Sequence, residues 1–162
     1  MFWLIAMSSG PSCARRCVRV RCCMPDEPDE VVGNLVAEWL RRAQADMSVA
    51  SLTDDERIAP EIVAFHAQQA VEKLLKALLV LRQIDFPHTH AIGALLALCE
   101  KAGFSDTQDV IEASSLTRYA VAARYPGEDE PVSRQEAREA ATLAGRVVAW
   151  GLAQIPADVK ER

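Results

Sequence analysis

The stretch from Phe65 to Leu81 constrains the fold of this chain most, because its apolar residues recur with the period of an α-helix. At 100° per residue these side chains gather on one broad side of a helix, a spacing that a β-strand cannot use. More apolar residues flank that side, so the sequence predicts a core helix with neighbours on more than one face. The residues on the broad side, including one just before the stretch, are Val63, Ala67, Ala70, Val71, Leu74, Ala77, Leu78 and Leu81.

The polar side chains of this helix form a narrow ridge, called the polar ridge below, which consists of His66, Gln69, Lys73 and Lys76. These residues follow one another at steps of three and four, and Glu72 is placed to pair with Lys76 at i,i+4. Charged and amide side chains are mostly exposed in proteins, so a solvated face is the simpler interpretation. A surface that contacts a ligand or a partner is the alternative.

Four further stretches have helical spacing, and none has the alternation of a strand. Five helices joined by short connections predict an all-α fold, an antiparallel and largely up-and-down bundle. The expected helices span residues 29–50, 60–81, 89–103, 105–125 and 133–155.

Local signals mark where three of these helices begin. Thr89 is placed to cap the third helix. Ser105 with Gln108 has the spacing of a capping box for the fourth helix, and Ser133 with Glu136 has it for the fifth. The fifth helix also carries alanine and glycine along one seam, which predicts a close approach to a neighbouring helix.

The first 24 residues differ from the rest of the chain in composition. They contain four of the five cysteines and four of the 18 basic residues, with no acid and no periodic apolar pattern. We expect an extension outside the fold, either disordered or due to a start assigned upstream of Met24, which leaves residues 25–162 as one helical domain. The cysteine spacing C-x3-C-x4-C-C lacks the two paired knuckles of familiar zinc sites, so no metal site is predicted.

Residues 25–162 are acidic, with 14 basic against 23 acidic side chains. Such a domain binds nucleic acid poorly unless it has a local basic patch, so RNA is not an expected ligand. The chain has no run of eighteen apolar residues, so we expect a cytoplasmic protein without a membrane span. Nothing in the sequence predicts a cofactor.

Three phrases stand in order along the chain: FHAQQAVEKLLKALLV at residues 65–80, the Thr89-His90 pair, and LTRYAVAARYPG at residues 116–127. Together they resemble the HEPN family (higher eukaryotes and prokaryotes nucleotide-binding domains), over roughly Val31 to Ile155. The resemblance implies a helical bundle. It also implies a partner, because such domains are often fused to, or encoded beside, minimal nucleotidyltransferases.

Many members of this family share an R-x4-6-H motif on the fourth helix, which serves metal-independent RNA cleavage across a dimer interface. In this chain the three positions open to the histidine after Arg118 hold Ala123, Arg124 and Tyr125. Counting from Arg124 gives no histidine either. The imidazole that acts as general acid and base is missing, so we predict no catalytic residue.

Arg118 and Tyr125 would share a face of a continuous helix, because seven residues make nearly two turns, whereas Arg124 would point about 120° away from Arg118. A guanidinium and a phenol ring on one face can hold a phosphate and stack a base. The alternative is that Arg118 pairs with an acid and Tyr125 packs under the Pro126-Gly127 turn.

His66, Lys73 and His90 complete the predicted nucleotide-binding residues. Each has a simpler interpretation: His66 as a partly buried histidine at the edge of the core, and His90 as a local hydrogen-bonding group in the first turn of its helix. His88 and His90 would give a metal only two ligands, so they do not predict a metal site.

We weigh three functions. The first is a noncatalytic HEPN module that binds a nucleotide such as ATP or AMP, or a small nucleotidyltransferase encoded nearby, as in toxin–antitoxin pairs. The second is a ribonuclease toxin that cleaves RNA without a metal, and the third is a structural dimer without a ligand. We expect a homodimer or a partner-bound protein, because the second and fourth helices carry more apolar surface than a monomer is expected to cover.

Overall fold

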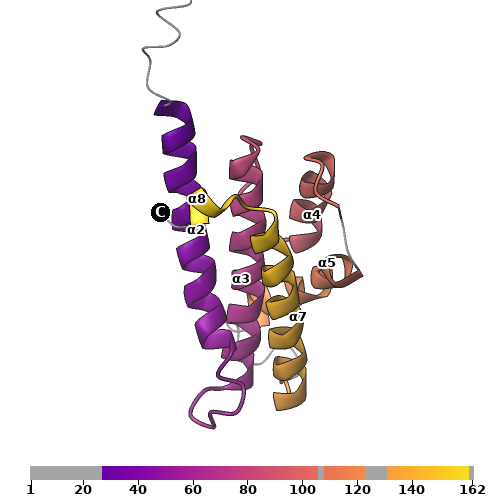
Figure 1. Ribbon diagram of the computed structural model, residues 1–162. Coiled ribbons are helices and arrows are strands. Elements are labelled where there is room, and N and C mark those ends of the chain that lie inside the picture. The colour runs from indigo at the N-terminus through magenta and orange to yellow at the C-terminus, as the bar shows by residue number, and fades with distance from the viewer. Residues whose placement is uncertain (1–26, 106–107, 123–130, 161–162) are drawn as a thin grey trace, which may run out of the picture.

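The computed structural model describes residues 27–105, 108–122 and 131–160, and within these ranges the chain is helical and contains no β-strand. The predicted all-α bundle is confirmed. Figure 1 shows the long helices side by side, with α3 (Pro60–Leu81) between α2 (Glu27–Ala50) and α7 (Arg134–Ala153). The other segments are α4 (Ile92–Lys101), α5 (Gln108–Glu112), the 3₁₀ helix η1 (Ala113–Arg118), α6 (Tyr119–Ala122) and α8 (Ala157–Lys160).

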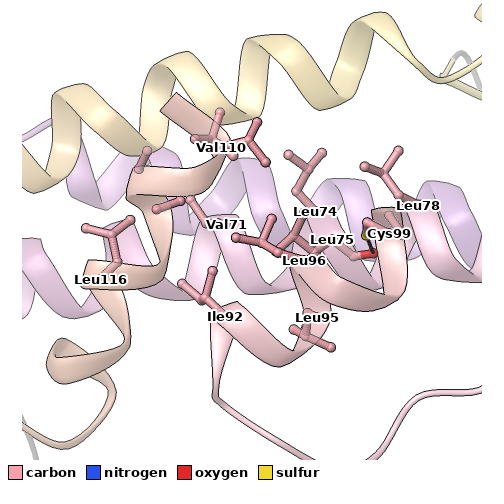
Figure 2. Close-up of a cluster of buried hydrophobic side chains, with 14 of the residues drawn as sticks. Val71, Leu74, Leu75, Leu78, Ile92, Leu95, Leu96, Cys99, Val110 and Leu116 are labelled. Atoms are coloured by element: carbon pink, nitrogen blue, oxygen red, sulfur yellow. Dashed lines mark hydrogen bonds between the residues drawn. The ribbon is translucent and has the colours of Figure 1, made fainter. Parts of the chain in front are cut away.

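Helix α3 is the core helix, as predicted, and 13 of its 22 residues are buried. It contacts α2, α4, α6, α7 and η1, so the chain covers it on most sides. Figure 2 shows Leu74 and Leu78 of α3 meeting apolar side chains from α4, α5 and η1 in one cluster.

Because the chain itself covers α3, the expected apolar surplus on this helix is absent, and that part of the argument for a dimer is wrong. In the described part of the chain, Ile62, at 36% exposure, is the one large apolar side chain of α3 that counts as exposed. On α5, Ile111 is 54% exposed. The free apolar surface on α2 was not predicted, and it consists of Val31 at 65% and Leu35 at 47%.

Helices α3, α4 and α7 run in the same direction, and α2 runs opposite to them (Figure 1, Figure 2), so the antiparallel order expected from the sequence holds for α2 and α3 but not among α3, α4 and α7. Val63, near the start of α3, packs against Ala137, near the start of α7, and Leu74 further along α3 lies against Gly151 near the end of α7. Helix α4 follows the same direction, since residues 82–91 return alongside the bundle before it begins (Figure 1). The α5–η1–α6 segment makes the second return.

The continuous fourth helix expected over residues 105–125 is wrong, because α5, η1 and α6 replace it. Four of its residues are buried at steps of three: Val110, Ala113, Leu116 and Tyr119. In an α-helix each step of three drifts by about 60°, which would turn Tyr119 to the face opposite Val110. A 3₁₀ helix has three residues per turn, so η1 keeps Ala113 and Leu116 on one line, with Val110 of α5 and Tyr119 of α6 on either side of them in the sequence. This line faces the core.

The expected cap at Thr89 is also wrong. Helix α4 begins at Ile92, and the Thr89 hydroxyl accepts a hydrogen bond from the Ala91 N–H (3.0 Å), which makes a local turn. The Ile92 N–H donates instead to the hydroxyl of Thr117 in η1 (3.1 Å), so a residue 25 positions away caps α4. His90 therefore lies before the helix rather than in its first turn.

The predictions for α7 are confirmed. Ser133 and Glu136 form the capping box, with the Ser133 hydroxyl accepting from the Glu136 N–H and the Glu136 carboxylate accepting from the Ser133 N–H. The seam of small residues allows the expected close approach, because a Cβ built at Gly151 would lie 2.5 Å from Cδ2 of Leu74.

Two of the fold predictions reach beyond the described residues. The predicted extension, residues 1–24, lies outside them, and so do residues 106 and 107, between the two members of the predicted capping box at Ser105 and Gln108. No described helix is both long and apolar enough to cross a membrane.

Candidate functional site

The predicted site residues that the structure describes lie in three places, and each is paired with a carboxylate of the same chain. His66 and Lys73 of α3 contact Asp46 of α2, His90 contacts Glu72, and Arg118 contacts Glu136 of α7. Arg124 and Tyr125 lie outside the described residues. The structure therefore does not bring Arg118 together with His66 and Lys73.

Arg118 is the last residue of η1, and its guanidinium lies between Tyr119 and α7. Its Nη2 donates to the Tyr119 hydroxyl (2.5 Å) and to Oε1 of Glu136 (2.9 Å). The guanidinium carbon lies 4.6 Å from the centre of the Tyr119 ring, at a distance that allows a cation–π interaction. Both hydrogen bonds to described residues leave from Nη2.

A pocket of about 470 Å³ lies beside Arg118, which is within the usual size range of small-molecule sites. Leu116, Tyr119 and Leu143 give it apolar walls, and Arg118, Glu136 and Glu139 give it charged groups. Leu116 and Tyr119 are buried, whereas the Arg118 side chain is 61% exposed. The pocket thus combines a fixed apolar floor with a guanidinium that a ligand can reach.

Arg118 and Glu136 stabilise each other's charged forms. The hydrogen bond with Tyr119 raises the pKa of Arg118, and the ion pair with Glu136 adds to this effect although burial opposes it. Hydrogen bonds from the Ser133 backbone and hydroxyl lower the pKa of Glu136, and Arg118 lowers it further. The Arg118–Glu136 pair is largely exposed and therefore weak, so a ligand phosphate can compete for the guanidinium.

His66 and Lys73 of the polar ridge contact α2. Asp46 is 7% exposed and accepts a hydrogen bond from Nδ1 of His66 (2.8 Å) and another from the Lys73 ammonium. The carboxylate can only accept, so Nδ1 of His66 carries the proton. These contacts tie α3 to α2 and give His66 the core-edge role that was its simpler interpretation.

Lys76 of the polar ridge is buried beside Glu72. Oε1 of this carboxylate accepts from Lys76 (2.7 Å), and Oε2 accepts from Gln68 (2.8 Å) and from Nδ1 of His90 (3.0 Å). The predicted Glu72–Lys76 pair is therefore confirmed. Burial raises the pKa of Glu72, but its hydrogen bonds to Lys76, Gln68 and His90 outweigh burial and hold the pKa below its usual value.

Two aromatic rings enclose the Lys76 ammonium. It lies 5.6 Å from the centre of the Trp39 ring of α2 and 5.8 Å from that of Phe86, and the two rings meet edge to face. Phe86 belongs to the returning segment 82–91, as does His90, so the network fastens this segment to the bundle. The polar ridge is thus neither a solvated face nor a free ligand surface, because its charges are neutralised within the chain.

Sequence reasoning missed the residues that complete the candidate site: Tyr119, Glu136 and Glu139. Arg118 and Tyr119 are neighbours in the sequence, but on an α-helix they would point about 100° apart. The steps of three from Val110 to Tyr119 were a readable signal for a 3₁₀ helix. Glu136 was recognised only as part of a capping box, and its second contact depends on how η1 docks against α7. In the described part of the chain, no cluster of histidine, cysteine and carboxylate groups could hold a metal ion.

The fold and the pocket define a small helical domain with a pocket of small-molecule size beside Arg118. The sequence profile of the HEPN domain matches residues 36–155, nearly three quarters of the chain, so the chain belongs to the HEPN domain family. It is similar to the protein TT1696 from Thermus thermophilus, known from a crystal structure, with 29% sequence identity and a TM-score of 0.66. That match covers 75% of this chain and 99% of TT1696. A comparison with curated protein sequences gave no significant match.

Proposed function

We propose that this chain is a noncatalytic HEPN module that binds a nucleotide in the pocket beside Arg118. The observation that carries the proposal is the pocket of about 470 Å³ with an exposed guanidinium at its edge, in a chain that lacks the histidine of the R-x4-6-H motif. A planar guanidinium suits a phosphate better than an ammonium does, because its N–H groups form a fixed fork.

The other predicted contacts support the proposal less. His66 and Lys73 are held by Asp46, and His90 is held by Glu72; among the described residues neither carboxylate contacts Arg118. A phosphate that recruited them would have to break pairs that join α2, α3 and the returning segment. We therefore assign the nucleotide contact to Arg118, whose guanidinium donates to the Tyr119 hydroxyl. Tyr119 is 5% exposed, so it does not take the base-stacking position suggested for Tyr125.

The proposed partner is a small nucleotidyltransferase encoded beside this chain, as in toxin–antitoxin pairs of this family. The chain lacks a histidine at the positions of the R-x4-6-H motif, so it would act through binding rather than cleavage. Exposed apolar side chains on α2 and α5, led by Val31 and Ile111, offer surface for such a partner or for a second copy of the chain.

Calorimetric titration with AMP and ATP tests the nucleotide site in the full chain. The Arg118→Ala change should weaken binding by roughly 1.5–3 kcal/mol, the range for hydrogen bonds to charged groups. Arg146→Ala is the matched control. Like Arg118, Arg146 makes an exposed ion pair, with Asp109 at 2.8 Å, but it belongs to α7 and does not line the pocket. Equal affinity of the wild type and Arg118→Ala would remove Arg118 from the site.

Incubation with a single-stranded RNA in the presence of EDTA tests the noncatalytic role. The wild type should leave the RNA intact at protein concentrations in the micromolar range. Cleavage that is lost in Arg118→Ala would instead establish the ribonuclease alternative.

Two measurements test the partner. A neighbouring gene with the pattern G-S-x10-D-x-D should encode a protein that copurifies with this chain on coexpression. Light scattering at tens of micromolar should give a dimer or, with the partner, a complex. A clean monomer that captures no such protein would refute the partner role.

A further inference from the structure

The pocket beside Arg118 has more negative than positive charge. Glu136 and Glu139 both line it, against one guanidinium. The surrounding domain adds to this imbalance, because residues 25–162 carry 14 basic and 23 acidic side chains. A ligand with several negative charges would meet repulsion here that a single phosphate largely avoids.

The two carboxylates differ in what they can still bind. Both oxygens of Glu136 are engaged, Oε1 by Arg118 and Oε2 by the N–H and hydroxyl of Ser133 (2.8 Å each). Glu139 accepts one hydrogen bond, from Gln135 to Oε1 (2.8 Å), and no described residue donates to its Oε2. Glu139 therefore brings a free acceptor to the pocket, on the next turn of α7 from the partner of Arg118.

In dinucleotide-binding α/β folds, a carboxylate near the phosphate-binding turn accepts a hydrogen bond from a ribose hydroxyl, and Glu139 offers the same kind of acceptor beside Arg118. The hydroxyls donate to the carboxylate, and a deoxyribose offers one donor fewer. The apolar walls at Leu116 and Leu143 then remain for the base.

We infer that the pocket takes a ribonucleoside with no more than one phosphate, and that Glu139 selects it by accepting hydrogen bonds from the ribose hydroxyls. The inference rests on the proposed nucleotide site and names the ligand class for it. Arg118 holds the phosphate, and the two carboxylates disfavour a triphosphate.

Calorimetric titration of the full chain with AMP, 2′-deoxy-AMP and ATP, without magnesium and at low salt, tests this inference. The wild type should bind AMP at least threefold more tightly than ATP, because each additional phosphate charge lies close to the carboxylates and is only partly screened. It should bind AMP about tenfold more tightly than 2′-deoxy-AMP, the effect of losing one hydrogen bond to a charged acceptor.

Two variants of Glu139 separate charge from hydrogen bonding. Glu139→Gln removes the charge but keeps an acceptor, so it should narrow the gap between AMP and ATP and retain part of the preference for ribose. Glu139→Ala removes both, so AMP and 2′-deoxy-AMP should bind alike. Glu100→Gln is the control, because Glu100 is an exposed glutamate on α4 that does not line the pocket.

The outcomes distinguish this inference from the proposed function. ATP binding as tightly as AMP, or equal affinity for AMP and 2′-deoxy-AMP in the wild type, would overturn the inference and leave nucleotide binding in place. A change in Glu100→Gln as large as that in Glu139→Gln would also overturn it, because the effect would then come from net charge alone. If a folded protein binds none of the three ligands, the proposed function fails and the inference fails with it.

Discussion

Substitution by alanine should have opposite effects on stability at the two glycines of α7, Gly145 and Gly151. A Cβ at Gly151 would lie 2.5, 2.8 and 2.9 Å from three side-chain atoms of Leu74, which is fully buried and cannot swing into solvent. A Cβ at Gly145 would meet no atom within 4 Å. Both positions are helical, so alanine gains the same helix propensity at each, up to about 1 kcal/mol.

The expected effects follow from adding the two contributions. Overpacking a core costs about 1–3 kcal/mol, and three contacts this short place Gly151→Ala in the upper part of that range. After the gain in propensity, Gly151→Ala should destabilise the protein by about 1–2 kcal/mol. Gly145→Ala should stabilise it by about 0.5–1 kcal/mol.

Urea denaturation followed by circular dichroism measures both free energies of unfolding. A second test combines Gly151→Ala with Leu74→Ala, which alone should cost about 2–5 kcal/mol. If the alanine at 151 presses on Leu74, the double variant should be more stable than the sum of the single effects predicts, by at least about 1 kcal/mol. The reasoning is refuted if Gly151→Ala stabilises the protein as Gly145→Ala does, or if the two changes are additive.

Three other changes probe the polar contacts. Glu72→Gln should cost about 1–3 kcal/mol at pH 7, since it leaves the Lys76 ammonium buried beside a neutral group. The pKa of Glu72 in the folded protein lies below 4.5. The difference in stability between Glu72→Gln and the wild type should therefore be constant above about pH 4.5 and shrink as the pH falls through the folded-state pKa. A difference that grows in acid would contradict this expectation. Thr117→Val should cost about 1–2 kcal/mol by leaving the Ile92 N–H without its acceptor, and unchanged stability in urea would show that water replaces it. Ser133→Ala should cost about 1 kcal/mol through the lost cap of α7, measured as a lower thermal midpoint.

The periodic parts of the fold could be predicted from the sequence because their signals are local. The apolar spacing around Leu74 and the capping box at Ser133 depend on residues a few positions apart, and both are found as expected. The close approach predicted from the small residues of α7 is also found at Gly151, because small side chains leave room for any neighbour.

The site could be predicted only in part, because its contacts join distant segments. Arg118 was named with an acid as its simplest partner, but nothing in the sequence indicated that the acid is Glu136, 18 residues further along. The polar ridge was expected to face solvent or a ligand, since no local pattern shows that Asp46 lies opposite His66 and Lys73. The hydrogen bond between Arg118 and Tyr119 was also not predicted, because side chains of neighbouring helical residues point about 100° apart.

The enclosure of Lys76 between Trp39 and Phe86 makes the lysines of this chain a chemical reporter of its integrity. The sequence contains four lysines, and of these Lys101 and Lys160 are exposed near helix ends, whereas Lys73 and Lys76 are held by carboxylates of the bundle. Acylating reagents attack the unprotonated amine and need room to approach it, so they should modify the first pair long before Lys76. The appearance of acylated Lys76 in a peptide map would show when α2 and the returning segment separate from α3.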